Sequence, residues 1–299
     1  FARIEVLQPA DIPRITGEVT ILSRLHLDGT GNAFLVFEDD GFGDDEEWRG
    51  WWDTRWARAQ HIVGVLKYIK YAIVDLDYAA PHYEPDWVNE VRRYGLSVGG
   101  RARFDVQKEP YRLTRDDADT LRRYLALVAR HESLFSDMGP RLRRALFTAG
   151  HYYEGHHSRA SATDRLIDLV IALEALFGPE NGRELSYRIS LAAATLLGNG
   201  PDDTERLFEF FRRMYDARST VVHGGDVLRE AGRPEDIAQL GDLVRQATVR
   251  IAVLFARGVA GRDRGQLLKA IARAAFDQDL RTKLRRESDL QSFLHDEGL

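Results

Sequence analysis

The sequence predicts a mainly α-helical protein, with a helical bundle over residues 113–299 and a smaller α+β region over residues 1–112. Two observations lead to this prediction. Apolar residues recur every three or four positions through most of the C-terminal part, which is the spacing of one helix face. β-branched runs and strong turn residues instead concentrate before about residue 110. The 299 residues suffice for two domains that each bury a core.

Composition narrows the class of protein and the kinds of site. The chain has no cysteine, which excludes disulfides, thiolate zinc sites and a cysteine nucleophile. This fits a reducing compartment, and we expect a cytoplasmic protein. No stretch is long and apolar enough to span a bilayer. The net charge of -5 provides no general attraction for nucleic acid, so any RNA contact must use a local basic patch.

The N-terminal region shows strand patterns. Residues 19–25 and 33–38 are rich in β-branched and apolar side chains, and the segment DGTGN at 28–32 between them predicts a hairpin turn. Residues 101–107 alternate polar and apolar side chains, as in a half-buried strand. Between these patterns, apolar residues at helical spacing over 62–73 favour a helix, although a strand is also compatible with their composition.

Helix start and stop signals divide the C-terminal part into successive helices. Thr114 and Asp117 have the spacing of a helix start, and a second helix is expected around residues 142–149. The segment Ala162–Phe177 is apolar on nearly every side, so we expect it at the centre of the bundle. A fourth helix is expected over 183–197, ending at Gly198.

Three further helical regions follow. The fifth helix is predicted to begin with a capping box of Asp202 and Glu205 and to end at His223, before a Gly-Gly pair. The sixth begins near Pro234, and its bundle-facing seam consists of Ile237, Leu240, Val244, Ala247, Ile251 and Leu254. The tail after residue 258 is helical in character, and its many charges favour loose packing.

Arg218 and His223 are the candidate catalytic pair. At about 100° per residue they lie about 140° apart around the helix, whereas Ser219 and His223 share a face. His223 ends the helix, where the dipole favours a cation and the imidazole is expected to face solvent. Such groups suit metal-free RNA cleavage, because histidine transfers protons near neutral pH and arginine binds phosphate oxygens. Alternatively, His223 only caps the helix and Arg218 pairs with a carboxylate such as Asp216.

Glu174 stands among apolar residues and needs a partner, which Arg218 or Arg188 would provide. Glu174 would then orient Arg218 in a site or form a structural ion pair. Arg212 and Arg213 are candidate substrate-binding residues, together with the arginines at 141, 143 and 144, although such runs are more often solvated helix faces.

Two other clusters favour structural roles. Tryptophans and arginines alternate over residues 48–58, but four acidic residues precede them, so packing is favoured over nucleic-acid binding. His151, His156 and His157 are expected in a loop, and no carboxylate spacing supports a metal site there.

Three segments together resemble the HEPN superfamily, most closely its Apea-like group: DRLIDLVIALEALFG (164–178), ELSYRISLAAATLLG (184–198) and MYDARSTVVHGG (214–225). The resemblance covers residues 141–257. It implies a helical bundle that forms a dimer in which the two R-x4-H motifs come together. Arg218 and His223 match the arginine and the histidine of this motif. Ser219 stands where the family often has Asn, Asp or His, and Glu174 matches a common carboxylate.

The resemblance implies a homodimeric, metal-independent endoribonuclease that needs no cofactor. Its substrate would be RNA, and it would belong to a toxin-like or defence system with a neutralising antitoxin or a defence partner. A non-catalytic HEPN module for dimerisation or for binding RNA or a partner is the alternative. A helical protein that binds a nucleotide phosphate through Arg218 is a third hypothesis.

Overall fold

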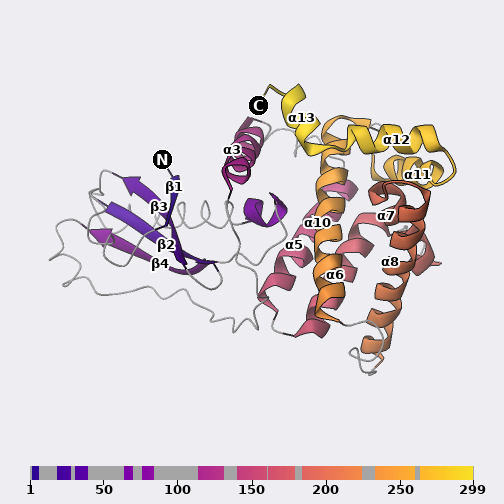
Figure 1. Ribbon diagram of the computed structural model, residues 1–299, viewed down its shortest axis with the longest axis horizontal. Helices are drawn as coiled ribbons and strands as arrows, with labels where there is room; N and C mark the ends of the chain where they lie inside the picture. The colour runs from indigo at the N-terminus through magenta and orange to yellow at the C-terminus, as the bar shows by residue number, and fades with distance from the viewer. Residues whose placement is uncertain are drawn as a thin grey trace. The chain divides into compact units, whose positions relative to one another are not determined.

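The chain divides into two compact units, Phe1–Ala118 and Asp119–Leu299. The computed structural model (Figure 1) describes residues 2–6, 19–27, 31–39, 64–69, 76–83, 114–130, 140–159, 161–178, 184–223, 233–259 and 263–298. The prediction of a mainly helical protein is confirmed for these residues. The expected strand at 101–107 and the tryptophan–arginine cluster at 48–58 lie outside them.

The N-terminal unit contains a four-stranded antiparallel sheet in the order β1-β3-β2-β4. Its strands are β1 (Ala2–Val6), β2 (Val19–Leu27), β3 (Gly31–Asp39) and β4 (Leu76–Tyr83). The expected hairpin is present, because β2 and β3 pair in antiparallel fashion. Val19 lies opposite Asp39 at one end of the pair, and Leu27 lies opposite Gly31 at the other. Pro81 lies in β4, which is an edge strand, the position in a sheet where proline is tolerated. Residues 64–69, within the ambiguous 62–73 segment, are helical.

The described C-terminal residues form helices. They are α3 (Arg115–Arg130), α5 (Pro140–Ser158), α6 (Ala162–Phe177), α7 (Leu185–Leu197), α8 (Pro201–Val222), α10 (Pro234–Ala256), α11 (Arg264–Ala274), α12 (Gln278–Glu287) and α13 (Leu290–Asp296). Helix α6 has the predicted bounds, and α10 begins at the predicted proline. The expected capping box at α3 is present, since Thr114 and Asp117 exchange hydrogen bonds of 2.8 and 3.1 Å.

Helix α6 is central, as its apolar surface predicted. It packs against α5, α7, α8 and α10 (Figure 1), and Leu166, Leu169 and Leu176 are buried. Gly178 ends the helix, with its N–H donating to the Glu174 carbonyl at 2.8 Å. A Cβ at this position would clash with the same carbonyl oxygen, so the close approach requires glycine.

Helix α10 confirms the predicted seam. Its members are all buried: Ile237, Leu240, Val244, Ala247, Ile251 and Leu254. The alternating spacing of three and four therefore identified the face of α10 that packs on α5, α6 and α7.

The predicted start of α8 was wrong. The helix begins at Pro201, with Gly200 rather than Asp202 at the N-cap. Proline suits this first position because it has no N–H to leave unpaired. Asp203 accepts a 2.8 Å hydrogen bond from the Asn199 N–H, and this bond together with Arg206 lowers the pKa of the Asp203 carboxyl.

The charged tail is firmly packed, contrary to the expectation of loose packing. Leu267, Ile271 and Leu284 are buried, and α11 and α12 both lie against α7. Arg257 of α10 pairs with Asp296 of α13 at 2.6 Å and lies over the Phe293 ring at 5.3 Å. The charges therefore connect helices rather than only facing solvent.

Arginines from distant helices bind the exposed carbonyls at helix C-termini. Arg264 of α11 donates to the carbonyls of Ala175 and Gly178 at the end of α6, at 3.0 and 2.7 Å. Arg250 of α10 donates to the Leu196 carbonyl of α7 at 2.7 Å. These carbonyls have no partner within their own helix and carry its negative dipole end, so a cation stabilises them.

Replacing Arg264 with alanine is expected to lower the free energy of unfolding by about 2 kcal/mol, because charged donors to the α6 carbonyls are lost. Urea unfolding followed by far-UV circular dichroism measures the change. Lys269→Ala is the matched control, since Lys269 is an exposed cation on the same helix. Equal destabilisation by both variants would show that the carbonyl contacts contribute nothing.

Candidate functional site

The C-terminal end of α8 carries the predicted catalytic pair. The helix ends at Val222, and His223 takes the C-cap position with its N–H donating to the Ser219 carbonyl at 3.2 Å. Val222 is 55% exposed, and His223 is also exposed, while Ser219 is half-buried one turn earlier. The imidazole therefore meets solvent at the end of the helix.

Arg218 is half-buried beside this end. Its Nε atom is buried without a hydrogen-bond partner, and among the described residues its guanidinium forms no ion pair, with Asp216 or any other carboxylate. A buried cationic donor without a partner is costly, and a bound anion would satisfy it.

Glu174 of α6 has a different partner from those predicted. The Tyr215 hydroxyl donates to its Oε1 atom at 2.9 Å, which links α6 to α8 across 41 residues of sequence. Arg188, one of the two expected partners, is exposed. Tyr215 lies three residues before Arg218 on the same helix, and a neutral phenol costs less to bury than a guanidinium. No signal in the sequence singled out Tyr215 as this partner.

The electrostatics of Tyr215 show how these groups interact. Burial, followed by the hydrogen bond to Glu174 and its negative charge, raises the pKa of Tyr215 to about 12, and the nearby positive charge of Arg218 opposes this rise. Tyr215 therefore remains a protonated donor at neutral pH. Its hydroxyl donates to Glu174 and itself lies within the electrostatic reach of Arg218.

At alkaline pH the free energy of unfolding is expected to fall less steeply in the Tyr215→Phe variant than in the native chain. The folded chain holds the phenolic proton up to about pH 12, against an ordinary pKa of 10.0. The resulting stabilisation is complete below pH 10.0 and is lost as the pH rises through the folded value, so the native chain has the steeper decline. Urea unfolding across this range, with Tyr187→Phe as the control for an exposed phenol, measures the difference. Parallel declines in all three proteins would contradict the prediction.

The two predicted substrate-binding arginines differ. Arg213 pairs with Asp236 of α10 at 3.1 Å and lies over the Phe210 ring at 5.3 Å, so it joins two helices. Arg212 is exposed, with its guanidinium 6.0 Å from the centre of the Phe208 ring. Of the two, Arg212 is better placed to meet a ligand.

The histidines expected in a loop belong to α5, which continues to Ser158. His151 is exposed, whereas His156 is buried and its ring nitrogen contacts the Tyr153 carbonyl. Within the described ranges, no group of three or more histidine, aspartate or glutamate side chains has the arrangement of a metal site. In the same part of the chain, no helix has the length and apolarity to cross a membrane.

Comparison with known proteins identified no relative. No protein-family model matches this chain, and no curated protein or solved structure matches it.

Proposed function

We propose that this chain is a metal-independent endoribonuclease of the HEPN type, with a HEPN-like C-terminal bundle and an N-terminal α+β region. One observation carries the proposal: an exposed histidine ends α8, and an arginine without a charged partner among the described residues lies five positions before it. This pair provides a proton-transfer group and a phosphate-binding group without a metal ion.

The proposed reaction is an internal displacement at phosphorus. A base removes the proton of the 2′-hydroxyl, the 2′-oxygen bonds to phosphorus, and the bond to the 5′-oxygen breaks as that oxygen is protonated. The products are a 2′,3′-cyclic phosphate and a 5′-hydroxyl. His223 serves in one proton step, and Arg218 stabilises the charge that develops on the phosphate oxygens.

The other residues of the site have supporting roles in this proposal. Ser219 shares a face with His223 and offers a hydroxyl that hydrogen-bonds a phosphate oxygen. Tyr215 and Glu174 join α8 to α6 by a hydrogen bond three residues before Arg218, and so fix the part of α8 that carries it. Arg212, on the exposed side of α8, binds the RNA backbone, whereas Arg213 has its ion pair with Asp236.

A single helix end provides one histidine, while the reaction needs both a base and an acid. We propose that a second copy of the chain supplies the other through a two-fold axis, so that two copies of the motif form one site. RNA cleavage in the cytoplasm would arrest growth, and a neutralising partner or defence complex would then control the enzyme. The N-terminal α+β region would sense a signal, guide the substrate or bind that partner.

RNA incubated in EDTA with the native chain and with His223→Ala tests the proposal. Cleavage that resists EDTA and is lost in the variant supports a metal-independent nuclease. RNA left intact by both proteins would overturn the enzyme and favour the non-catalytic HEPN module that binds RNA or a partner.

A further inference from the structure

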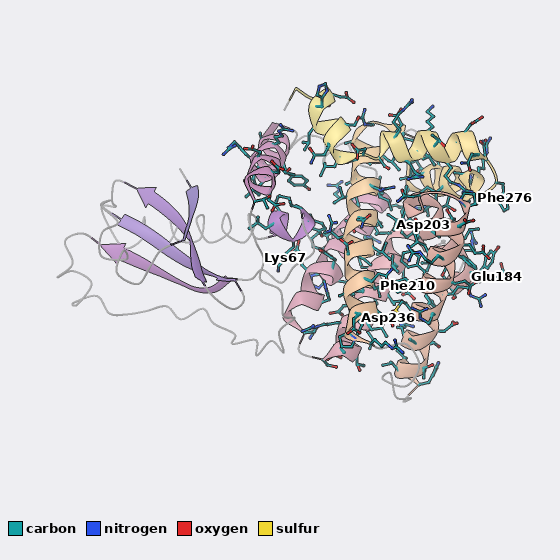
Figure 2. All side chains as sticks on the ribbon, viewed as in Figure 1. Lys67, Glu184, Asp203, Phe210, Asp236 and Phe276 are labelled. Carbon is teal, nitrogen blue, oxygen red and sulfur yellow. The ribbon has the colours of Figure 1, made fainter. Side chains whose placement is uncertain are left out.

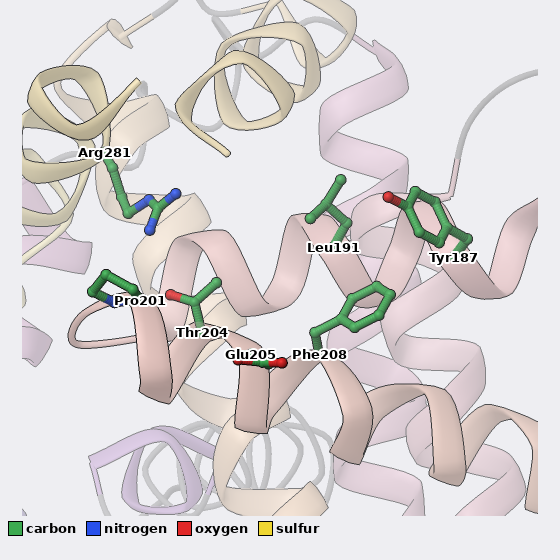
Figure 3. Close-up of a pocket in the computed structure, with 7 residues that line it drawn as sticks. All are labelled: Tyr187, Leu191, Pro201, Thr204, Glu205, Phe208 and Arg281. Carbon is green, nitrogen blue, oxygen red and sulfur yellow. The ribbon is translucent and has the colours of Figure 1, made fainter. Parts of the chain in front are cut away.

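A groove of about 370 Å³ lies between α7, α8 and α12 in the C-terminal unit. Figure 3 shows the aromatic rings of Tyr187 and Phe208 at one end and the guanidinium of Arg281 at the other. Thr204 and Glu205 line the α8 side between them. The groove thus combines aromatic surface with a few polar groups, as sites for planar ligands do.

The two aromatic rings form an open stacking surface. They contact edge to face, with centroids 5.4 Å apart, and Tyr187 is 49% exposed. Arg212 adds a cation over the Phe208 ring. Aromatic rings flanked by arginines bind bases by stacking and the adjoining phosphates by charge.

Arg281 is held in a fixed orientation at the other end. Its Nε donates to the Ala274 carbonyl at 3.0 Å and one terminal nitrogen donates to the Ala275 carbonyl at 2.6 Å. The other terminal nitrogen, Nη1, has no acceptor among the described residues. A guanidinium anchored in this way presents its remaining N–H groups to a ligand at little entropic cost.

Glu205 indicates which part of a nucleotide would enter the groove. Its carboxylate is exposed at the lining and would repel a phosphate. The same carboxylate accepts hydrogen bonds from the N–H groups of a base. A planar base with N–H donors fits the rings, the carboxylate and Arg281 together, whereas an anion does not.

The groove and the candidate catalytic end lie on one flank of α8. Thr204, Phe208, Arg212, Tyr215 and Ser219 follow one another at steps of three or four residues, which keeps them on one side of the helix. From Phe208 to His223 the helix rises about 22 Å at 1.5 Å per residue. At the 3.4 Å rise of a stacked strand this distance corresponds to roughly six to seven nucleotides.

We propose that the groove is a subsite for an unpaired base of single-stranded RNA, whose backbone follows the α8 flank past Arg212 to His223 at the end of the helix. This inference rests on the proposed function, because it assigns the substrate class as single-stranded RNA and places a base contact away from the cleaved phosphate.

Binding of a short fluorescein-labelled single-stranded RNA, measured by anisotropy, tests the subsite. All proteins carry His223→Ala so that the RNA stays intact. Adding Tyr187→Ala is expected to weaken binding about tenfold, because one stacked base is lost. Tyr187→Phe keeps the ring and is expected to bind as the parent does. Phe276→Ala, which removes an 88% exposed ring outside the groove, is the matched control and should have no effect (Figure 2).

An abasic strand of the same length separates base from backbone contacts. The parent and Tyr187→Ala are expected to bind it equally, since it has phosphates but no base to stack. Equal binding of normal RNA by both proteins would overturn the subsite, and so would a parent that binds no RNA.

The outcomes also separate the subsite from the nuclease. Binding that depends on Tyr187, with no cleavage by the chain that retains His223, would support the subsite and reject the nuclease. Cleavage in EDTA, together with RNA binding that does not depend on Tyr187, would support the nuclease and reject the subsite.

Discussion

Replacing His223 with alanine is expected to lower the rate of RNA cleavage by roughly 10²- to 10⁴-fold, the usual contribution of a positioned acid or base. The imidazole is exposed at the C-cap of α8, and its backbone N–H, which alanine retains, makes the capping bond to Ser219. The substitution therefore removes the proton-transfer group and leaves the helix end intact. Single-turnover cleavage in EDTA measures the chemical step, and circular dichroism checks the fold.

His295→Ala is the matched control for this experiment. The His295 side chain is 90% exposed on α13, away from α8, so its removal should leave the rate unchanged. If His223→Ala cleaved RNA as fast as the native chain, His223 would be only a helix cap. If both variants lost activity equally, a general effect on the protein would be responsible.

Replacing Phe211 with alanine is expected to lower the free energy of unfolding by about 3–5 kcal/mol. Phe211 is 1% exposed on α8 and packs edge to face against Phe210, with ring centroids 5.9 Å apart. Its removal leaves a cavity that the neighbouring helices α6 and α7 can fill only in part, so dispersion contacts and apolar burial are both lost. Urea unfolding followed by far-UV circular dichroism gives the difference.

Phe276→Ala is the control for phenylalanine removal. Its ring is 88% exposed between α11 and α12, so the expected change is within about 0.5 kcal/mol. A Phe211 variant as stable as this control would mean that the α8 core face does not support the bundle.

The helices were largely predictable because their signals are local. Helix α6 begins after Ser161, whose side chain accepts a hydrogen bond from the Asp164 N–H. It ends at Gly178, whose N–H donates to the Glu174 carbonyl. The buried seam of α10 follows from the periodicity of its own apolar residues. The capping box of α3 joins Thr114 and Asp117, which are only three residues apart. The predicted start of α8 was wrong because Asp202 and Glu205 have the spacing of a capping box, whereas the helix begins at Pro201 with Gly200 as its N-cap.

The candidate site divides in the same way. Sequence position alone put Arg218 one turn before an exposed His223 at a helix end. The partner of Glu174 could not be read from position, since Tyr215 is 41 residues away and α8 carries several other polar side chains.

By itself, the sequence determined the helical class, the bounds of α6, the start of α10 and the position of the Arg218–His223 pair, because each depends on residues within one or two turns. Only the tertiary structure decided that Tyr215 holds Glu174, that Arg213 binds Asp236, that Arg264 binds the end of α6, and that Tyr187 and Arg281 share a groove. Those contacts depend on how the helices pack in register, which no single segment encodes.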